Sequence, residues 1–159
     1  TEIYTLSLHD ALPIYVPPRV AGAIEGETLK LVKVTGVAAP QDWGNLSNDQ
    51  HLWWHAGMKP GDQLTLGFPA PKAGRYQVVG RFLQARDYGI HQLAINGRPA
   101  GAARDFYTPE VTPSDEVILG EFDLKESDNQ FTVTVVGANE KAVKSYMFGL
   151  DYLLLKPAP

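Results

Sequence analysis

Three carboxylates near the two ends of the chain could share one cation. Glu25 and Glu27, in AIEGETL, are two residues apart, so on a strand their side chains project from the same face. Asp151, in GLDYLLL, is expected to share a face with Leu153 and Leu155, where an unpaired carboxylate is costly to bury. If the first and last strands are neighbours, the acids converge, and oxygen ligands in irregular geometry favour calcium over magnesium. In the alternative interpretation, Asp151 caps a backbone N–H and both glutamates are solvated.

All three tryptophans lie in residues 40–57, a segment whose Asn, Asp and Gly content predicts a long loop or irregular hairpin. Trp43 is in DWGN, and Trp53 and Trp54 are in LWWH. Sugars stack their C–H faces on flat rings while polar neighbours bind the hydroxyls, so the three rings are candidate sugar ligands. Alternatively, they close one end of the fold. In an extended chain only one of Trp53 and Trp54 faces the core, and the sequence leaves open which.

Catalytic patterns are weak in this chain. His51 and His55 have the four-residue spacing of a zinc site only if they lie on a helix, and Gly57 and Pro60 argue against one. No Glu follows His51 to act as a general base. The sequence contains no G-x-S-x-G, P-loop or G-x-G-x-x-G motif. We therefore expect a binding domain that carries out no chemistry itself.

Period-two alternation of apolar residues predicts an all-β fold. Residues 63–68, 76–82 and 90–95 are expected to form three antiparallel strands joined by tight turns, the third ending at the hairpin signal Asn96-Gly97. The other predicted strands cover residues 23–31, 33–37, 116–122, 130–136 and 149–155. With 15 Gly, 12 Pro and no convincing amphipathic helix, this pattern indicates an antiparallel β-sandwich of the jelly-roll or a related type.

The overall composition narrows the possible partners. At 159 residues the chain is long enough for one domain with a proper core. A formal net charge of −4 argues against a nucleic-acid partner, which would require a basic face. No apolar run approaches the ~18 residues of a membrane helix, so no membrane partner is expected. The absence of cysteine excludes disulfides and leaves the compartment open.

The domain organisation begins with a segment that does not resemble natural protein. Residues 1–14, TEIYTLSLHDALPI, resemble one translated reading frame of a common sequencing-library adapter at every position. We therefore expect a non-native head, a missing true N-terminus and a natural gene that continued upstream. Residues 15–22, with Pro17-Pro18, are predicted to form a stiff linker, residues 23–155 the sandwich and residues 156–159 a tail.

An early E-x-E strand combined with a terminal L-D-Y-L-x-L strand resembles the carbohydrate-binding modules of families six and thirty-five. These modules are galactose-binding-like β-sandwiches, and the resemblance implies a structural calcium held by Glu25, Glu27 and Asp151. PGDQLTLGF, AGRYQVVGRF, ARDYGIHQLAING and YMFGLDYLLL are also similar to the C-terminal sandwich of bacterial glycoside hydrolases of the family 172 type. The likeness extends over residues 23–155.

The resemblance also implies a function and a setting. A non-catalytic accessory module would bind a polysaccharide or oligosaccharide for an upstream catalytic domain, in a secreted or periplasmic protein. Loops at one edge of such sandwiches form the sugar cleft, which implicates Trp43, Trp54, Tyr88 and Asn139, with Tyr107 as a further candidate. In the alternative, the sandwich packs against its own catalytic domain or mediates oligomerisation, and Trp53 or Trp54 anchors that interface.

Overall fold

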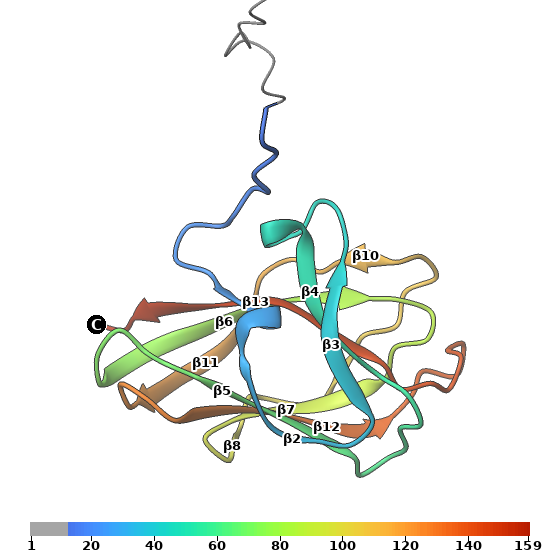
Figure 1. The fold of residues 1–159 in the computed structure, drawn as a ribbon. Coiled ribbons are helices and arrows are strands. Elements are labelled where there is room, and N and C mark those ends of the chain that lie inside the picture. The colour runs from blue at the N-terminus through green and yellow to red at the C-terminus, as the bar shows by residue number, and fades with distance from the viewer. Residues whose placement is uncertain (1–12) are drawn as a thin grey trace, which may run out of the picture.

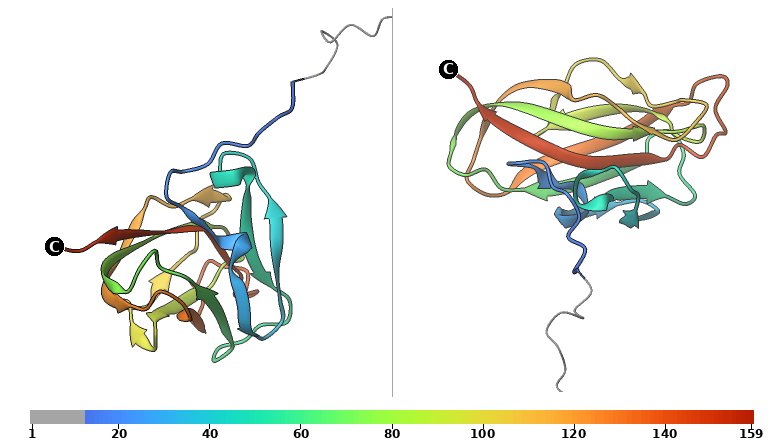
Figure 2. Two further views of the ribbon diagram at one scale, coloured as in Figure 1. Left: turned by 60° about the vertical axis from the view of Figure 1, so that its left-hand side comes forward. Right: turned by 90° about the horizontal axis from the view of Figure 1, so that it is seen from above.

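A computed structural model describes residues 13–159 as two antiparallel β-sheets packed face to face (Figures 1 and 2). The predicted all-β sandwich is therefore confirmed. The adapter-like head falls almost entirely on residues 1–12, outside the described part of the chain. Within residues 13–159, no helix is both long and apolar enough to cross a membrane.

The larger sheet has seven strands in the path β10-β6-β13-β4-β3, with β1 beside β13 and β11 beside β6. Their bounds are β1 Ile24–Glu25, β3 Val37–Asp42, β4 Gln50–His55, β6 Gly74–Gln84, β10 Thr112–Pro113, β11 Val117–Leu124 and β13 Phe148–Pro157. The smaller sheet has six strands in the path β2-β5-β12-β7-β8, with β9 beside β7. Its strands are β2 Lys30–Val34, β5 Gln63–Phe68, β7 Ile90–Ile95, β8 Arg98–Pro99, β9 Arg104–Asp105 and β12 Asn129–Gly137.

The three central strands are correctly placed along the chain, but their predicted pairing is wrong. Strand β6 lies in the larger sheet between β13 and β10, whereas β5 and β7 lie in the smaller sheet on either side of β12. The chain therefore passes from the smaller sheet to the larger sheet between β5 and β6, and it returns between β6 and β7. Each of the two sheets needs apolar strands, because the core forms between their inner faces. The Asn96-Gly97 hairpin is confirmed as the turn between β7 and β8, and both residues have positive φ.

The first and last strands are neighbours, as predicted: Ile24 pairs with Leu153 and Glu25 with Tyr152. The predicted strand over residues 23–31 is nevertheless wrong, because the chain turns into a short 3₁₀ helix, η1 (Gly26–Thr28), and resumes as β2. A Cβ at Gly26 would lie 2.2 Å from the Leu150 carbonyl oxygen, so only glycine can pass β13 here. Glu27 consequently does not share a strand face with Glu25.

A β-bulge in β13 overturns the predicted orientation of Asp151. The register with β6 shifts between Leu150 and Tyr152, which leaves Asp151 as the extra residue. Leu153 still faces the core, whereas the Asp151 carboxylate receives hydrogen bonds from Ser47 and Arg81. The bulge therefore removes the aspartate from the apolar row that simple alternation assigned to it.

The segment that contains the tryptophans was predicted to be a long loop or an irregular hairpin, and it is a hairpin whose two strands pair regularly. Strands β3 and β4 pair without interruption from Val37 opposite His55 to Asp42 opposite Gln50. They are joined by residues 43–49, which include a 3₁₀ helix, η2 (Ser47–Asp49). Alternation along β4 places Trp54 in the core and Trp53 on the outer face of the sheet.

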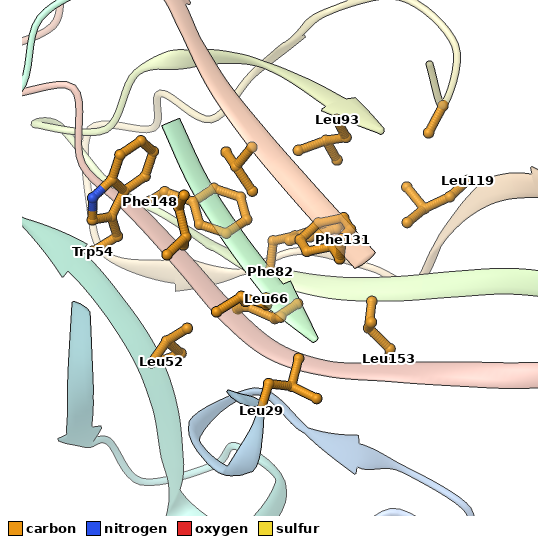
Figure 3. Packing of buried hydrophobic residues seen from close by; sticks show 14 of the residues in the cluster. Leu29, Leu52, Trp54, Leu66, Phe82, Leu93, Leu119, Phe131, Phe148 and Leu153 are labelled. Carbon is orange, nitrogen blue, oxygen red and sulfur yellow. The ribbon is translucent and has the colours of Figure 1, made fainter. Parts of the chain in front are cut away.

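The core between the sheets is rich in aromatic rings (Figure 3). The ring of Phe148 packs against Phe82 at 5.7 Å and against Phe131 at 6.4 Å between centroids, joining the two sheets. Trp54 lies at one end of this cluster, has 0% exposure and donates its indole N–H to the Thr35 carbonyl oxygen at 2.6 Å. The core is therefore continuous along the sandwich, and the inward side chains of β4 and β13 anchor these two strands to it.

Candidate functional site

A small hollow of about 140 Å³ lies on the outer face of the larger sheet, where loops from several strands meet. We call it the tryptophan hollow. Its walls come from β3, β4, the end of β6 and four connecting segments: Gln41, Trp43, Trp53, Leu83, Ala85, Asp87, Tyr88, Val111 and Met147. The volume corresponds to roughly five water molecules at about 30 Å³ each, so the hollow suits part of one small ring.

The two tryptophans of the hollow are held from different directions. Trp53 stacks on His55 with ring centroids 3.8 Å apart and planes at 20°, so one face of its indole is already covered. Trp43 follows the end of β3, where its backbone N–H donates to the Asp49 carbonyl oxygen at 2.8 Å. Its side chain is 38% exposed. Both rings are therefore placed by the β3–β4 hairpin, and Trp43 remains the more accessible of the two.

The floor of the hollow depends on a glycine in β13. Gly149 lies between Leu83 of β6 and Trp53 of β4 in the sheet. A Cβ at this position would be 2.8 Å from the Tyr88 hydroxyl oxygen and 3.1 Å from the Leu83 Cβ. Tyr88 can therefore lie across the sheet, and burial raises the pKa of its phenol. Tyr88 is 4% exposed, so it presents little more than an edge to a ligand.

Two polar side chains border this otherwise apolar surface. Gln41 is half-buried and offers an amide, and Asp87 is half-buried and offers a carboxylate. Among the lining residues, all within the described chain, there is no lysine or arginine. The hollow is therefore an apolar concavity with two aromatic rings and a few hydrogen-bonding groups at its border. Such an arrangement is suited to binding a neutral polyhydroxylated ring.

The predicted carboxylates meet around the η2 turn, at a second location. The Ser47 hydroxyl donates to Glu25 Oε1 at 2.7 Å, and the Ser47 N–H donates to Asp151 Oδ1 at 3.1 Å. The Asn48 amide donates to Glu27 Oε1 at 3.0 Å, and Arg81 pairs with Asp151 Oδ2 at 2.8 Å. Residues from both ends of the chain are thus joined through one turn, and we call this group the carboxylate cluster: Glu25, Glu27, Asp151.

Burial dominates the protonation of this cluster. It raises the pKa of Asp151 to about 6, although the Arg81 guanidinium and the Ser47 N–H act in the opposite direction. Burial also raises the pKa of Glu25, with the Ser47 hydroxyl opposing it and Glu27 adding to it. The raised pKa values of Glu25 and Asp151 indicate that the hydrogen-bond donors around these carboxylates do not fully offset the cost of burying their charge.

The carboxylate oxygens of the cluster are suitable ligands for a hard cation. Glu25 Oε2 and Glu27 Oε2 are buried and, within the described residues, receive no hydrogen bond. Asp151 has both oxygens engaged, and residues 13–159 contain no group of three His, Cys, Asp or Glu side chains gathered closely enough to hold a metal alone. Free buried carboxylate oxygens fit calcium, which also accepts backbone carbonyl and water ligands.

The other predicted site residues lie elsewhere. Trp54 was predicted as a sugar ligand, and this is wrong, because its side chain is enclosed in the core and has no exposed face. Asn139 donates to Asp105 Oδ2 at 2.6 Å, and the Tyr107 N–H donates to Asp105 Oδ1 at 2.9 Å. Neither Asn139 nor Tyr107 lines the tryptophan hollow. Of the six predicted sugar ligands, the hollow therefore brings together Trp43, Trp53 and Tyr88.

His51 and His55 lie on strand β4, in agreement with the prediction that they are not on a helix. His51 is 0% exposed, and burial lowers its pKa to about 4, so the ring is neutral in the folded protein at pH 7. His55 stacks on Trp53. His51 is therefore enclosed on the same face of β4 as Trp53, beside Gly149, and His55 supports the Trp53 ring that borders the hollow.

Several residues of the hollow had no recognisable signal in the sequence. Gln41 and Leu83 are ordinary strand residues, and Val111 belongs to a long connection without periodicity. Asp87 was identifiable as a polar residue in the turn after β6, but its role depends on which loop lies opposite. The hollow is assembled from residues 41 to 147, so its membership follows from tertiary contacts alone.

Comparison with known proteins identifies relatives at the level of fold. No protein-family model matches the chain, and no curated protein matches it. Among solved structures, xanthan lyase from Paenibacillus superposes with a TM-score of 0.76 at 23% identity over 89% of this chain. The chain spans only 14% of that lyase.

Two isolated modules give matches that cover nearly their whole length. A family 35 carbohydrate-binding module from Clostridium thermocellum superposes with a TM-score of 0.54 at 14% identity, over 86% of this chain and 97% of the module. The CBM36-1 domain of a multidomain xylanase from the hindgut metagenome of Trinervitermes trinervoides gives a TM-score of 0.51 at 14% identity, with coverages of 86% and 97%. These likenesses show that the chain shares the β-sandwich fold of these two modules.

Proposed function

We propose that this chain is a non-catalytic carbohydrate-binding module that receives a sugar ring in the tryptophan hollow. The observation that carries the proposal is the pairing of Trp43 and Trp53 around an apolar floor bordered by Gln41 and Asp87. The aromatic rings stack on the C–H face of the sugar, and the amide and carboxylate bind its hydroxyl groups. The fold shared with modules that are named as carbohydrate-binding supports the same function.

The shallow site supports a role as part of a larger protein. A hollow of about 140 Å³ binds a single ring weakly, at roughly millimolar Kd, because ordering costs offset most of the stacking gain. Weak binding becomes useful when the module is tethered to a catalytic domain and raises the local substrate concentration. We therefore propose an accessory module of a secreted or periplasmic carbohydrate-active protein, consistent with xanthan lyase and the multidomain xylanase, which carry the same fold as one part.

The sugar proposal is tested with Trp53→Ala. Titration of the purified chain with xylose, glucose, mannose and galactose, followed by tryptophan fluorescence and NMR shifts, is expected to give saturable binding of at least one sugar. Trp53→Ala should weaken that binding at least tenfold, because one of the two tryptophan rings that line the hollow is removed. Val136→Ala, on the exposed face of β12, is the matched control and should bind as the unaltered protein does. Equal binding by the Trp53 variant would refute the assignment.

We further propose that calcium occupies the carboxylate cluster, held by Glu25, Glu27 and Asp151, and acts structurally by neutralising the buried acids. Two buried carboxylate oxygens without a hydrogen-bond donor support this proposal. Because the ion would join β1, η1 and β13, it would stabilise the folded state by mass action. When bound, it supplies positive charge and no reaction step.

Calcium removal should lower the melting temperature. At a calcium concentration one hundred times Kd the gain is about 2.7 kcal/mol, which corresponds to roughly 5–10 °C for a domain of this size. Scanning calorimetry in EDTA, in calcium and in magnesium would measure the shift, and only calcium is expected to restore the higher value. Glu25→Gln, which removes one charge with little change in shape, should abolish the response. Identical melting curves in EDTA and calcium would contradict the proposal.

An interaction module is the second candidate, and one observation favours it. Strand β2 is an edge strand of the smaller sheet, and it and the start of β3 expose four large apolar side chains: Leu31, Val32, Val34 and Val37. Such an edge could pack against another domain or a second copy. Sedimentation equilibrium separates the candidates, since an interaction module should self-associate or bind its partner without any response to sugars.

A further inference from the structure

Trp43 lines two hollows, and the tryptophan hollow is one of them. The second is an open hollow of about 370 Å³, lined by Tyr15, Pro17, Asp42, Trp43, Gly44, Asn48, Asp49 and Gln50. We call it the leader hollow, because two of its lining residues, Tyr15 and Pro17, belong to the leader, the segment of residues 13–20 that precedes the sandwich. The same residue, Trp43, thus lines both the tryptophan hollow and the leader hollow.

The inner wall of the leader hollow is the end of the β3–β4 hairpin, which two hydrogen bonds hold together. Gln50 donates to Asp42 Oδ1 at 2.7 Å across the end of the two strands. Trp43 donates its backbone N–H to the Asp49 carbonyl oxygen at 2.8 Å, which fixes the ring at the start of the turn. These bonds place an amide and a carboxylate beside an exposed indole.

The outer wall is the segment that the sequence predicts as a linker, and it is attached to the sandwich. Asn48 donates its N–H to the Pro18 carbonyl oxygen at 2.7 Å, and Arg19 donates to Asn48 Oδ1 at 3.0 Å. The Val20 N–H donates to the Ser47 hydroxyl at 3.0 Å, and the Tyr15 hydroxyl donates to the Asp49 carboxylate. The leader can be followed past the η2 turn in Figure 1 and in the left view of Figure 2.

Tyr15 therefore presents an aromatic ring that is fixed yet accessible. Its side chain is 74% exposed, while its hydroxyl group is held by Asp49. Together with Trp43 it gives the leader hollow two aromatic rings, and Asp42, Asn48 and Gln50 supply groups that bind hydroxyls. Among the described residues that line either hollow there is no lysine or arginine, whereas Asp42, Asp49 and Asp87 are acidic.

We propose that the leader hollow is a second sugar subsite, so that the two hollows bind consecutive residues of a neutral oligosaccharide that passes over Trp43. This inference rests on the proposed function of the tryptophan hollow. Acidic sugars are disfavoured, because a uronate carboxylate would face Asp42 or Asp87 and no lysine or arginine lines either hollow within the described residues. The site is completed by a segment outside the sandwich, Tyr15 and Pro17.

Affinity as a function of chain length tests the second subsite. Isothermal titration with mono-, di- and trisaccharides of β-1,4-linked xylose, mannose and glucose and of β-1,3-linked galactose is expected to show at least one series with a roughly tenfold gain from monosaccharide to trisaccharide. Tyr15→Ala should remove most of that gain. Val16→Ala, in the same leader, exposed and outside the lining, should retain it. Glucuronate should bind at least tenfold more weakly than glucose.

The outcomes separate this inference from the proposed function. Saturable monosaccharide binding that is lost in Trp53→Ala, combined with no gain in longer sugars, would overturn the second subsite alone. A gain that is the same in Tyr15→Ala and the unaltered protein would overturn it as well. Glucuronate binding as tight as glucose binding would overturn the neutral assignment. No detectable binding of any sugar in the panel would overturn both the subsite and the proposed function.

Discussion

Trp54→Ala is expected to lower the free energy of unfolding by about 3–5 kcal/mol, the range for removing a large aromatic side chain from a packed core. Its side chain has 0% exposure, and its indole N–H donates to the Thr35 carbonyl oxygen at 2.6 Å. The substitution leaves a cavity between β4 and the aromatic cluster and leaves that carbonyl oxygen without its indole donor. Urea denaturation followed by circular dichroism would measure the loss.

Trp43→Ala is the matched control for this prediction. The same change of residue type at a 38% exposed side chain should cost less than about 1 kcal/mol, because little packing is lost. Trp43→Ala should instead weaken sugar binding, whereas Trp54→Phe, which keeps most of the volume, should bind sugar normally. If Trp54→Ala and Trp43→Ala destabilised the fold equally, the placement of Trp54 in the core would be wrong.

Arg81→Met is expected to destabilise the fold by about 2–4 kcal/mol at pH 7 in EDTA. Asp151 is 0% exposed, and its salt bridge to Arg81 at 2.8 Å supplies the cation nearest to its carboxylate. Removal of one partner of a buried pair leaves an uncompensated charge, typically at about 3–5 kcal/mol, and the 25% exposure of Arg81 reduces this figure. Arg75→Met, which breaks an exposed pair with Glu121, should cost less than about 1 kcal/mol.

The cost of Arg81→Met should be smaller at pH 5 than at pH 7. Burial already raises the pKa of Asp151 in the folded protein to about 6, and loss of the guanidinium raises it further. Between that value and the pKa of 3.8 expected for the unfolded chain, the folded state binds the proton more tightly, so its stability increases as the pH falls. The double variant Arg81→Met with Asp151→Asn should recover much of the loss at pH 7. A loss that does not change with pH would contradict this account.

The sequence was sufficient for the fold class and for most strand positions. Alternation of apolar residues is a local property of a half-buried strand, so β5, β7, β11, β12 and β13 were located within one or two residues of their bounds. The Asn96-Gly97 turn was equally local, because its positive φ angles require these residue types. The neighbourhood of the first and last strands was also predicted correctly, from the acids that each strand carries.

Tertiary structure decided everything that depends on which strand lies beside which. Adjacent residues such as Trp53 and Trp54 must point in opposite directions, but the pairing of β4 with β3 and β13 determines that Trp54 is inside. The bulge at Asp151 and the close approach at Gly26 arise where β13 meets η1, a contact between the two ends of the sandwich. Residues as distant as Tyr15, Gln41 and Met147 line neighbouring hollows for the same reason, since non-local packing leaves no periodic trace in the sequence.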